Sequence, residues 1–275
     1  MRCETISAAA LSPGLARLGS QAELVSYCRE DCGTLAGRKG RWAVVICPGG
    51  AYQMLAPTEG EPAALAFLAA GVQAFVLRYS VAPAVYPTQL LELGAAVAYL
   101  RDHAAEYGID RVAVCGFSAG GHLAGCLANL WEAPALEALG REKSLLRPDA
   151  AILCYPAISA GEQGCPGLFE TLLGGTPGPE HTPLSLETSV SAQNPPSFLW
   201  CTCSDQMVPM ENTLLYAGAL RRAGVLFELH IFPSGPHAMS IATEESAPGP
   251  KYADPHVAQW LPLCLEWLQG LGKEV

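Results

Sequence analysis

Short apolar runs alternate with longer stretches of helical spacing along most of the chain. Runs of strand length predict strands at residues 42–47, 72–79, 111–117, 149–155, 196–203 and 227–232. Apolar positions at helical spacing predict helices at residues 59–70, 88–107, 119–130, 210–223 and 256–269. This alternation predicts an α/β fold, in which a mostly parallel sheet carries helices on both faces. In such sheets the chemistry gathers in the loops that follow the carboxyl ends of the strands.

One segment, residues 156–195, interrupts the alternation. It is rich in Gly, Pro, Ser and Thr and has a short helical pattern only at residues 168–173. A long irregular insertion in a compact domain is usually a lid or a binding loop. The chain has 275 residues, a length that suits one large α/β domain better than two compact ones. We therefore expect residues 1–275 to form a single domain in which residues 156–195 are a lid-like insertion.

Composition and charge narrow the environment and the partners. Half of the residues are hydrophobic and 15% are charged, as expected for a deeply buried sheet. The formal net charge of −10 repels phosphate backbones, so nucleic acid is not an expected partner. Neither a signal-peptide pattern at the N-terminus nor an apolar stretch of membrane-spanning length is found in the sequence. These features predict a cytoplasmic protein that does not enter a membrane.

The eleven cysteines do not form a metal-binding or redox pattern. No Cys-x-x-Cys pair occurs, and five of the cysteines lie in apolar runs. Those in apolar runs are Cys47, Cys115, Cys154, Cys201 and Cys203. We expect them to be small buried hydrophobic residues in a reducing compartment, and we expect no metal.

The sharpest motif is Gly116-Phe117-Ser118-Ala119-Gly120, which matches the pattern Gly-x-Ser-x-Gly. An apolar strand precedes it and a helical pattern follows it, as in the strained turn that exposes a nucleophilic serine. A side chain at position 116 or 120 would crowd the neighbouring strand and helix. The alternative interpretations are a phosphate-binding loop and an ordinary tight turn. For the first, the chain has no Gly-Lys-Ser/Thr sequence. Ser118 is therefore the candidate nucleophile.

A serine hydroxyl needs a base, and histidine is the usual one. His237 follows the last predicted strand through the loop at 233–236, at the carboxyl edge of the sheet. That position fits the order serine, acid, histidine that accompanies this motif. His122 lies one helical turn after Ser118 and His230 lies inside a strand, so both are expected to be packing residues. The remaining histidines fall on helices or in the insertion, at His103, His181 and His256.

The acid must lie between Ser118 and His237 in the chain, again after a strand. Asp205 directly follows the strand at 196–203. Its alternative role is that of a turn or capping residue. Asp149 lies at the start of its strand, the wrong end of the sheet, and Glu211 is explained as an acid at a helix start. Asp205 is therefore the candidate that orients the base.

Small residues follow the strand at 42–47, in the tract Pro48-Gly49-Gly50-Ala51-Tyr52. The loop at this place supplies backbone N–H groups to the oxyanion of a serine hydrolase. We assign Gly50 and Ala51 to that role, together with the N–H group of Ala119. Tyr52, Tyr155 and Met207 are expected to line the substrate pocket.

Taken together, these segments resemble the α/β-hydrolase esterases of the hormone-sensitive-lipase-like and acetyl-xylan-esterase-like type. The resemblance is carried by CPGGAY (47–52), LRYSVAPAVYP (77–87), GFSAGGHLA (116–124), PPSFLWCTCSDQMVP (195–209) and FELHIFPSGPH (227–237). It implies a sheet of about eight strands and hydrolysis of short acyl esters, often O-acetyl groups on sugars. The chain departs from the pattern at Pro48, where the lipase-type motif begins with His, at Ala51 in place of its third Gly, and at Ala238, where relatives often have Gly.

The leading hypothesis is a serine carboxylic-ester hydrolase of the acetyl esterase type. It would act on a small-molecule ester and need no cofactor. Two alternatives stay open at this point: an amidase, peptidase or formamidase that uses the same three residues, and a non-catalytic binding protein with the same fold. An oligomer is compatible with the sequence but is not predicted by it.

Overall fold

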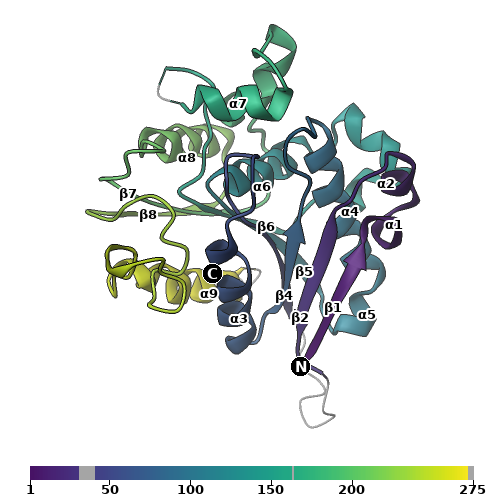
Figure 1. The fold of residues 1–275 in the computed structure, drawn as a ribbon, viewed down its shortest axis with the longest axis horizontal. Coiled ribbons are helices and arrows are strands. Elements are labelled where there is room, and N and C mark those ends of the chain that lie inside the picture. Colours follow the sequence, from purple (N-terminus) through teal and green to yellow (C-terminus); the bar gives the residue numbers. More distant parts are fainter. Residues whose placement is uncertain (31–40, 163, 272–275) are drawn as a thin grey trace.

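The computed structural model describes residues 1–30, 41–162 and 164–271. Its centre is an eight-stranded sheet with the order β1-β2-β4-β3-β5-β6-β7-β8 (Figure 1). The strands are β1 (Arg2–Ser7), β2 (Glu23–Cys28), β3 (Trp42–Cys47), β4 (Gln73–Arg78), β5 (Arg111–Phe117), β6 (Ala150–Cys154), β7 (Ser197–Thr202) and β8 (Phe227–Phe232). Strands β3 to β8 are parallel to one another, whereas β1 pairs with β2, and β2 with β4, in antiparallel fashion. The α/β-hydrolase fold with a mostly parallel sheet is therefore confirmed.

Helices lie on both faces of the sheet. The longer ones are α3 (Glu61–Ala69), α4 (Thr88–Asp102), α6 (Ala119–Leu130), α7 (Pro166–Leu173), α8 (Glu211–Ala223) and α9 (Trp260–Gly270), and the short ones are α1 (Ala8–Leu11), α2 (Pro13–Arg17) and α5 (Ala104–Tyr107). Single 3-10 turns include η1 (Pro57–Glu59), η4 (Pro179–Leu184) and η5 (Leu186–Thr188). One face packs against α4, α6 and α8, and the other against α3 and α9 (Figure 1).

The alternation of side chains along β3 shows how one strand serves both faces. Ala43, Val45 and Cys47 belong to the core beneath α4 and α6, whereas Trp42, Val44 and Ile46 belong to the core beneath α3 and α9. All six side chains are buried. A continuous apolar run is therefore the expected sequence of a strand that is covered on both sides.

Strand register brings the carboxyl ends of the parallel strands to one edge of the sheet. Cys47 pairs with Gly116, Phe117 with Cys154, and Cys154 with Trp200. Thr202 pairs with Phe232 at the ends of β7 and β8. The loops that follow these strands begin at residues 48, 118, 155, 203 and 233, so they all emerge at this edge.

Several boundaries differ from the sequence-based expectations. The helix expected at 88–107 is divided at His103 into α4 and α5, and the one expected at 256–269 starts at Trp260 after a short 3-10 turn. The patterns did not predict β1 and β2. In β1 only Ile6 is buried, because this strand is the sheet's edge, so its sequence lacks the apolar run of the inner strands.

The insertion at 156–195 is more ordered than its composition suggests. It holds α7, η4 and η5, and it buries Leu168, Phe169 and Leu172 of α7 with Leu184 and Leu186 against the main core. In Figure 1 the helix α7 lies over the side of the sheet that carries α8. No helix in the described part of the chain is long and apolar enough to cross a membrane.

Candidate active site

Ser118 occupies a sharp turn between β5 and α6. Its φ of 53° lies in the left-handed region, which a non-glycine residue rarely adopts. The flanking glycines are required by space: a Cβ at Gly116 would collide with the carbonyl of Gly120, and one at Gly120 would collide with the carbonyl of Cys47. The crowding expected from the sequence at both glycines is therefore confirmed. The turn places Ser118 at the N-terminus of α6, where negative charge is stabilised.

His237 reaches Ser118 from a different part of the chain. Its Nε2 lies 2.8 Å from the Oγ of Ser118, and its Nδ1 lies 2.6 Å from Oδ2 of Asp205. The three residues are largely buried, with Asp205 5% and Ser118 9% exposed. The structure thus brings together the three side chains that the sequence analysis singled out, although 119 positions separate Ser118 from His237.

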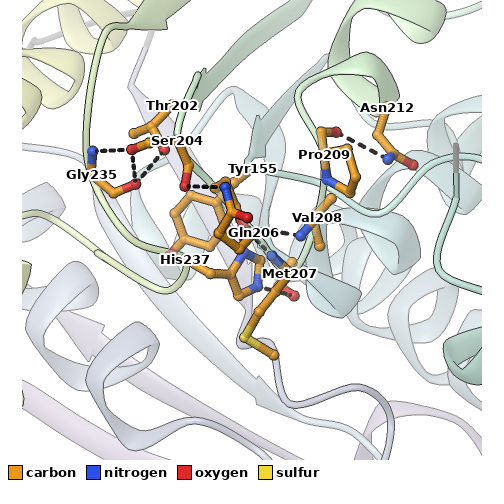
Figure 2. A network of polar contacts seen from close by, with 12 residues as sticks. Tyr155, Thr202, Ser204, Gln206, Met207, Val208, Pro209, Asn212, Gly235 and His237 are labelled. Atoms are coloured by element: carbon orange, nitrogen blue, oxygen red, sulfur yellow. Dashed lines mark hydrogen bonds and ion pairs between the residues drawn. The ribbon is translucent and has the colours of Figure 1, made fainter.

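Asp205 is held by its own loop before it meets His237. Its Oδ1 accepts hydrogen bonds from the backbone N–H groups of Met207, at 2.9 Å, and Val208, at 3.0 Å. Figure 2 shows these two residues beside His237. One carboxylate oxygen is therefore used to fix the loop, and the other is free to accept from the imidazole. The carboxylate is both a capping group and a partner of the imidazole, so the two roles weighed from the sequence coexist.

A second set of contacts ties the loop that carries Asp205 to the loop that carries His237. Gly235 accepts hydrogen bonds at its carbonyl from Oγ1 of Thr202, at 2.8 Å, and Oγ of Ser204, at 3.0 Å. Its N–H group donates back to Oγ of Ser204 at 2.9 Å (Figure 2). The distance between acid and base is therefore set by hydrogen bonds between the side chains of Thr202 and Ser204 and the backbone of Gly235, at the ends of neighbouring strands.

These contacts determine where the protons lie. A carboxylate only accepts hydrogen bonds, so Nδ1 of His237 carries a proton and donates it to Asp205. The other ring nitrogen, Nε2, then has a lone pair directed at the hydroxyl of Ser118. This arrangement can remove a proton from Ser118 and stabilise the imidazolium that results.

Backbone N–H groups for an oxyanion are present near Ser118. Gly50 and Ala51 have positive φ angles of 123° and 54°, and a Cβ at neighbouring Gly49 would lie 2.9 Å from Cβ of Ser118. Within residues 1–30, 41–162 and 164–271, no acceptor is found for the N–H groups of Gly50, Ala51 or Ala119. Their role as oxyanion donors stays a prediction.

The three residues expected to line the pocket lie in different environments. Tyr52 is 1% exposed, and its hydroxyl is bound to Nδ1 of His122 at 2.9 Å. Tyr155 is 2% exposed, its ring packs edge-on against His237, and its hydroxyl donates to Glu59 at 2.7 Å. Met207 is 71% exposed next to His237 (Figure 2). Both tyrosine hydroxyls are therefore engaged inside the protein, and contact of these residues with a substrate stays a prediction.

The rival histidines and carboxylates lie elsewhere. His122 is fully buried between Tyr52 and the carbonyl of Leu184, as a packing residue. His230 pairs with Glu228 on β8. Asp149 accepts from the N–H group of Val112 at the start of β5, the edge of the sheet opposite Ser118. The expectation that these residues belong to the scaffold is confirmed.

Four of the five cysteines in apolar runs lie in the core. The cysteines Cys47, Cys115, Cys154 and Cys201 are buried as expected, but Cys203 is exposed, because β7 ends at Thr202. No group of three metal-binding side chains is found in the part of the chain that the structure describes.

Sequence reasoning missed Glu59, which is 1% exposed and lies beside the site. The sequence pattern could not distinguish Glu59 from Glu61, two positions later, because both have the position of an acid at a helix start.

Comparison with known proteins shows which protein families the chain resembles. The model of the family described as BD-FAE matches residues 36–145. The chain is 36% identical to endo-1,4-beta-xylanase B of Butyrivibrio fibrisolvens over 74% of its own length, and 30% identical to an acetylxylan esterase of Xylanibacter ruminicola over 73%. It spans 33% and 42%, respectively, of the length of these two relatives.

Solved structures match almost end to end. An acetyl ester-xyloside bifunctional hydrolase from Caldicellulosiruptor lactoaceticus is 36% identical, with a TM-score of 0.78 over 92% of this chain and 89% of that chain. A carboxylesterase from Lactobacillus plantarum is 26% identical, with a TM-score of 0.81 over 99% of this chain and 98% of that chain. The whole fold, and not only the nucleophile turn, is therefore shared with these proteins.

Proposed function

Because the chain belongs to the α/β-hydrolase esterases, as its full-length likeness to one such enzyme at 36% identity shows, we propose that it hydrolyses short-chain carboxylic esters with Ser118, His237 and Asp205. The observation that carries this proposal is the unbroken hydrogen-bond line from Ser118 through His237 to Asp205, with distances of 2.8 and 2.6 Å. A line of serine, imidazole and carboxylate in this order is an activated nucleophile.

The reaction follows from where the protons lie. His237 removes the proton of Ser118 while Oγ attacks the ester carbonyl, and Asp205 stabilises the imidazolium. The oxyanion of the tetrahedral intermediate accepts hydrogen bonds from the N–H group of Ala119 and from those of Gly50 and Ala51. The imidazolium then protonates the departing alcohol, which leaves an acyl group on Ser118. Water, deprotonated by His237, attacks that acyl group, and the imidazolium then returns the proton to Oγ of Ser118 as the acid is released.

The acyl group is proposed to be acetyl and the alcohol to be a carbohydrate. Support comes from the relatives, one of which is named an acetylxylan esterase and another an acetyl ester-xyloside hydrolase. The chain corresponds to less than half of the length of the acetylxylan esterase, so the substrate preference is a proposal about the esterase domain that they share.

The cysteines support a cellular location. The ten described cysteines are all free thiols, which supports a reducing, cytoplasmic location.

Turnover of an aryl acetate tests the proposed chemistry. The purified protein should release the phenol, and Ser118→Ala should abolish release while its unfolding midpoint stays near that of the wild type. A matched control is Ser144→Ala, at an exposed serine in the 3-10 helix Lys143–Leu145, which should keep the wild-type activity. Equal turnover by wild type and Ser118→Ala would overturn the proposal.

A substrate series tests the bond and the acyl group. Acetyl, butyryl and octanoyl esters of one phenol, an acetylated xylo-oligosaccharide and an aryl acetanilide should be compared at equal enzyme concentration. The proposal predicts that the acetyl esters are the best substrates. Preference for the anilide would instead indicate an amidase that uses the same three residues.

A further inference from the structure

A buried carboxylate lies beneath the active site and takes no part in the chemistry derived above. Glu59 closes the turn η1, and 1% of its surface is exposed. Its Oε2 accepts a hydrogen bond from the backbone N–H group of Gly49, and its Oε1 accepts one from the hydroxyl of Tyr155, each at 2.7 Å. A buried carboxylate loses much hydration energy, so its presence calls for a reason beyond packing.

In one direction, Glu59 holds the loop that begins after β3. Gly49 is packed so tightly between Glu59 and Ser118 that a Cβ there would lie 2.6 Å from Oε2 of Glu59 and 2.9 Å from Cβ of Ser118. The next two residues are Gly50 and Ala51, whose N–H groups are proposed to bind the oxyanion. The hydrogen bond to Gly49 therefore fixes the position from which both of these donors extend.

In the other direction, Glu59 reaches the loop that carries His237. The hydroxyl of Tyr155 donates to Glu59 and accepts from the N–H group of Ser240 at 2.9 Å, three residues after His237. Oγ of Ser240 donates at 2.6 Å to the carbonyl of Thr58, the residue before Glu59. Segments from three separate parts of the chain thus meet at one carboxylate.

We propose that Glu59 is a positioning residue that keeps the oxyanion loop and the His237 loop in register with Ser118. This inference rests on the proposed function and adds to it a residue that touches neither the substrate nor the reacting atoms. Its geometric basis is the chain of contacts Gly49–Glu59–Tyr155–Ser240, which joins the two loops beneath the nucleophile. Burial raises the pKa of Glu59, while the hydrogen bonds from Tyr155 and Gly49 and the nearby His237 act in the opposite direction.

The chemistry of the two contacts requires a carboxylate. Gly49 and Tyr155 both donate, so the group between them needs two acceptor atoms. A glutamine has one acceptor and one NH₂ group, and its NH₂ would face either the N–H group of Gly49 or the hydroxyl of Tyr155. Glu59→Gln is therefore expected to displace one of the two loops even though its size and shape are nearly unchanged.

The experiment compares Glu59→Gln with two other Glu→Gln variants. Glu61→Gln changes an exposed acid two positions away. Glu92→Gln changes another fully buried carboxylate, which accepts hydrogen bonds from Ser20 and Ser80. Each variant is measured for kcat/KM on an aryl acetate, for affinity toward phenylboronic acid, which forms a tetrahedral adduct with an activated serine, and for its unfolding midpoint in urea.

If Glu59 positions the oxyanion donors, Glu59→Gln should lower kcat/KM and boronate affinity together by about tenfold or more, because oxyanion donors act on the tetrahedral state. Glu61→Gln should match the wild type in all three measurements. Glu92→Gln should unfold at lower urea but keep kcat/KM within about twofold at 25 °C, as expected of a substitution away from the reacting groups. A Glu59→Gln variant that stays within twofold of Glu61→Gln would overturn the inference.

A double variant adds a readout that a purely structural role would not produce. Tyr155→Phe removes the hydroxyl that conflicts with the NH₂ group of the glutamine, so Glu59→Gln/Tyr155→Phe should lose less activity than the product of the two single losses. Should Glu59→Gln not fold, Tyr155→Phe alone must still lower kcat/KM and boronate affinity in parallel. An unchanged Tyr155→Phe, or multiplicative losses, would contradict the positioning role. Turnover by Ser118→Ala would overturn the proposed function itself, which separates the two failures.

Discussion

Two rows of side chains lie at the carboxyl edge of the sheet, and they differ in how they are held. The reacting row is Ser118, His237 and Asp205, which follow the strands β5, β8 and β7 and are joined by hydrogen bonds of 2.8 and 2.6 Å. The supporting row beneath it is Glu59 with Tyr155, whose contacts run to backbone N–H groups of two loops. In the proposed mechanism the reacting row has the groups that exchange protons, and the supporting row is proposed to fix the distances between them.

Because of this difference, we expect substitutions in the two rows to lower the catalytic rate by different amounts. Each reacting side chain has a chemical task that its neighbours cannot perform, so its loss should remove most of the catalysis. Each supporting side chain acts through geometry, so its loss should leave the reaction slower but intact. Substitutions at Ser118, Asp205 and His122 test this difference, and the expected loss of activity decreases in that order.

The largest effect is expected at the nucleophile. Ser118→Ala removes the atom that forms the acyl-enzyme and should lower kcat by about 10⁶-fold relative to the wild type. Release of the phenol from an aryl acetate is followed for hours with the variant. The wild type is diluted until its rate of release can be measured over the same time. A loss of less than tenfold would show that another residue attacks the ester.

The next effect is expected at the acid. Asp205→Asn keeps an oxygen that accepts from Met207 and Val208, but its NH₂ group would face Nδ1 of His237 and favour the wrong tautomer. The expected loss in kcat is about 10⁴-fold. Asp254→Asn, a change at an acid that caps the turn before α9, is the control and should keep kcat. Comparable values for both variants would contradict the assignment of Asp205.

The smallest effect on activity is expected at His122, which packs beside the site without touching the reacting row. Burial lowers the pKa of His122 to about 4, whereas its hydrogen bond to Leu184 acts in the opposite direction. Below its unfolded pKa of 6.5 the unfolded chain binds a proton that the folded protein does not. Stability is therefore lost as the pH falls from about 6.5 to 4, by about 3 kcal/mol for this group.

Urea unfolding at pH 7 and at pH 4.5 measures this dependence. His122→Gln should be less stable than the wild type at pH 7 but should lose less stability on acidification. His256→Gln, at an exposed histidine, should keep the wild-type dependence. An identical acid-induced loss in the wild type and in His122→Gln would show that another group is responsible.

The sequence predicts the reacting row because local patterns mark it. Ser118 lies in a Gly-x-Ser-x-Gly turn, and Asp205 and His237 each follow a strand whose apolar run is plain. The ends of β3, β5 and β8 were predicted to the residue. β3 and β5 have apolar runs that are buried on both faces, whereas β8, an edge strand with only Phe232 buried, has apolar residues at alternate positions in FELHIF. β1, the strand at the other edge, could not be predicted in the same way, because its sequence RCETIS has neither an apolar run nor the alternation of β8.

The supporting row could not be predicted from the sequence, because its members are defined by what surrounds them. Glu59 and Glu61 lie in the same short segment, yet the first is buried against Gly49 and Tyr155 and the second is exposed. Tyr155 was expected in the pocket, and only the structure shows that its hydroxyl joins Glu59 to Ser240. Such contacts arise from tertiary packing between distant segments and leave no periodic signal.

Covalent labelling tests whether Ser118 is the nucleophile and whether His237 activates it. The protein is treated with a fluorophosphonate, digested, and mapped by mass spectrometry, with His237→Gln treated in parallel. The account predicts one adduct, on Ser118, that forms rapidly in the wild type and at least about 10³-fold more slowly in His237→Gln. An adduct on a different serine, or equal labelling of both proteins, would contradict it.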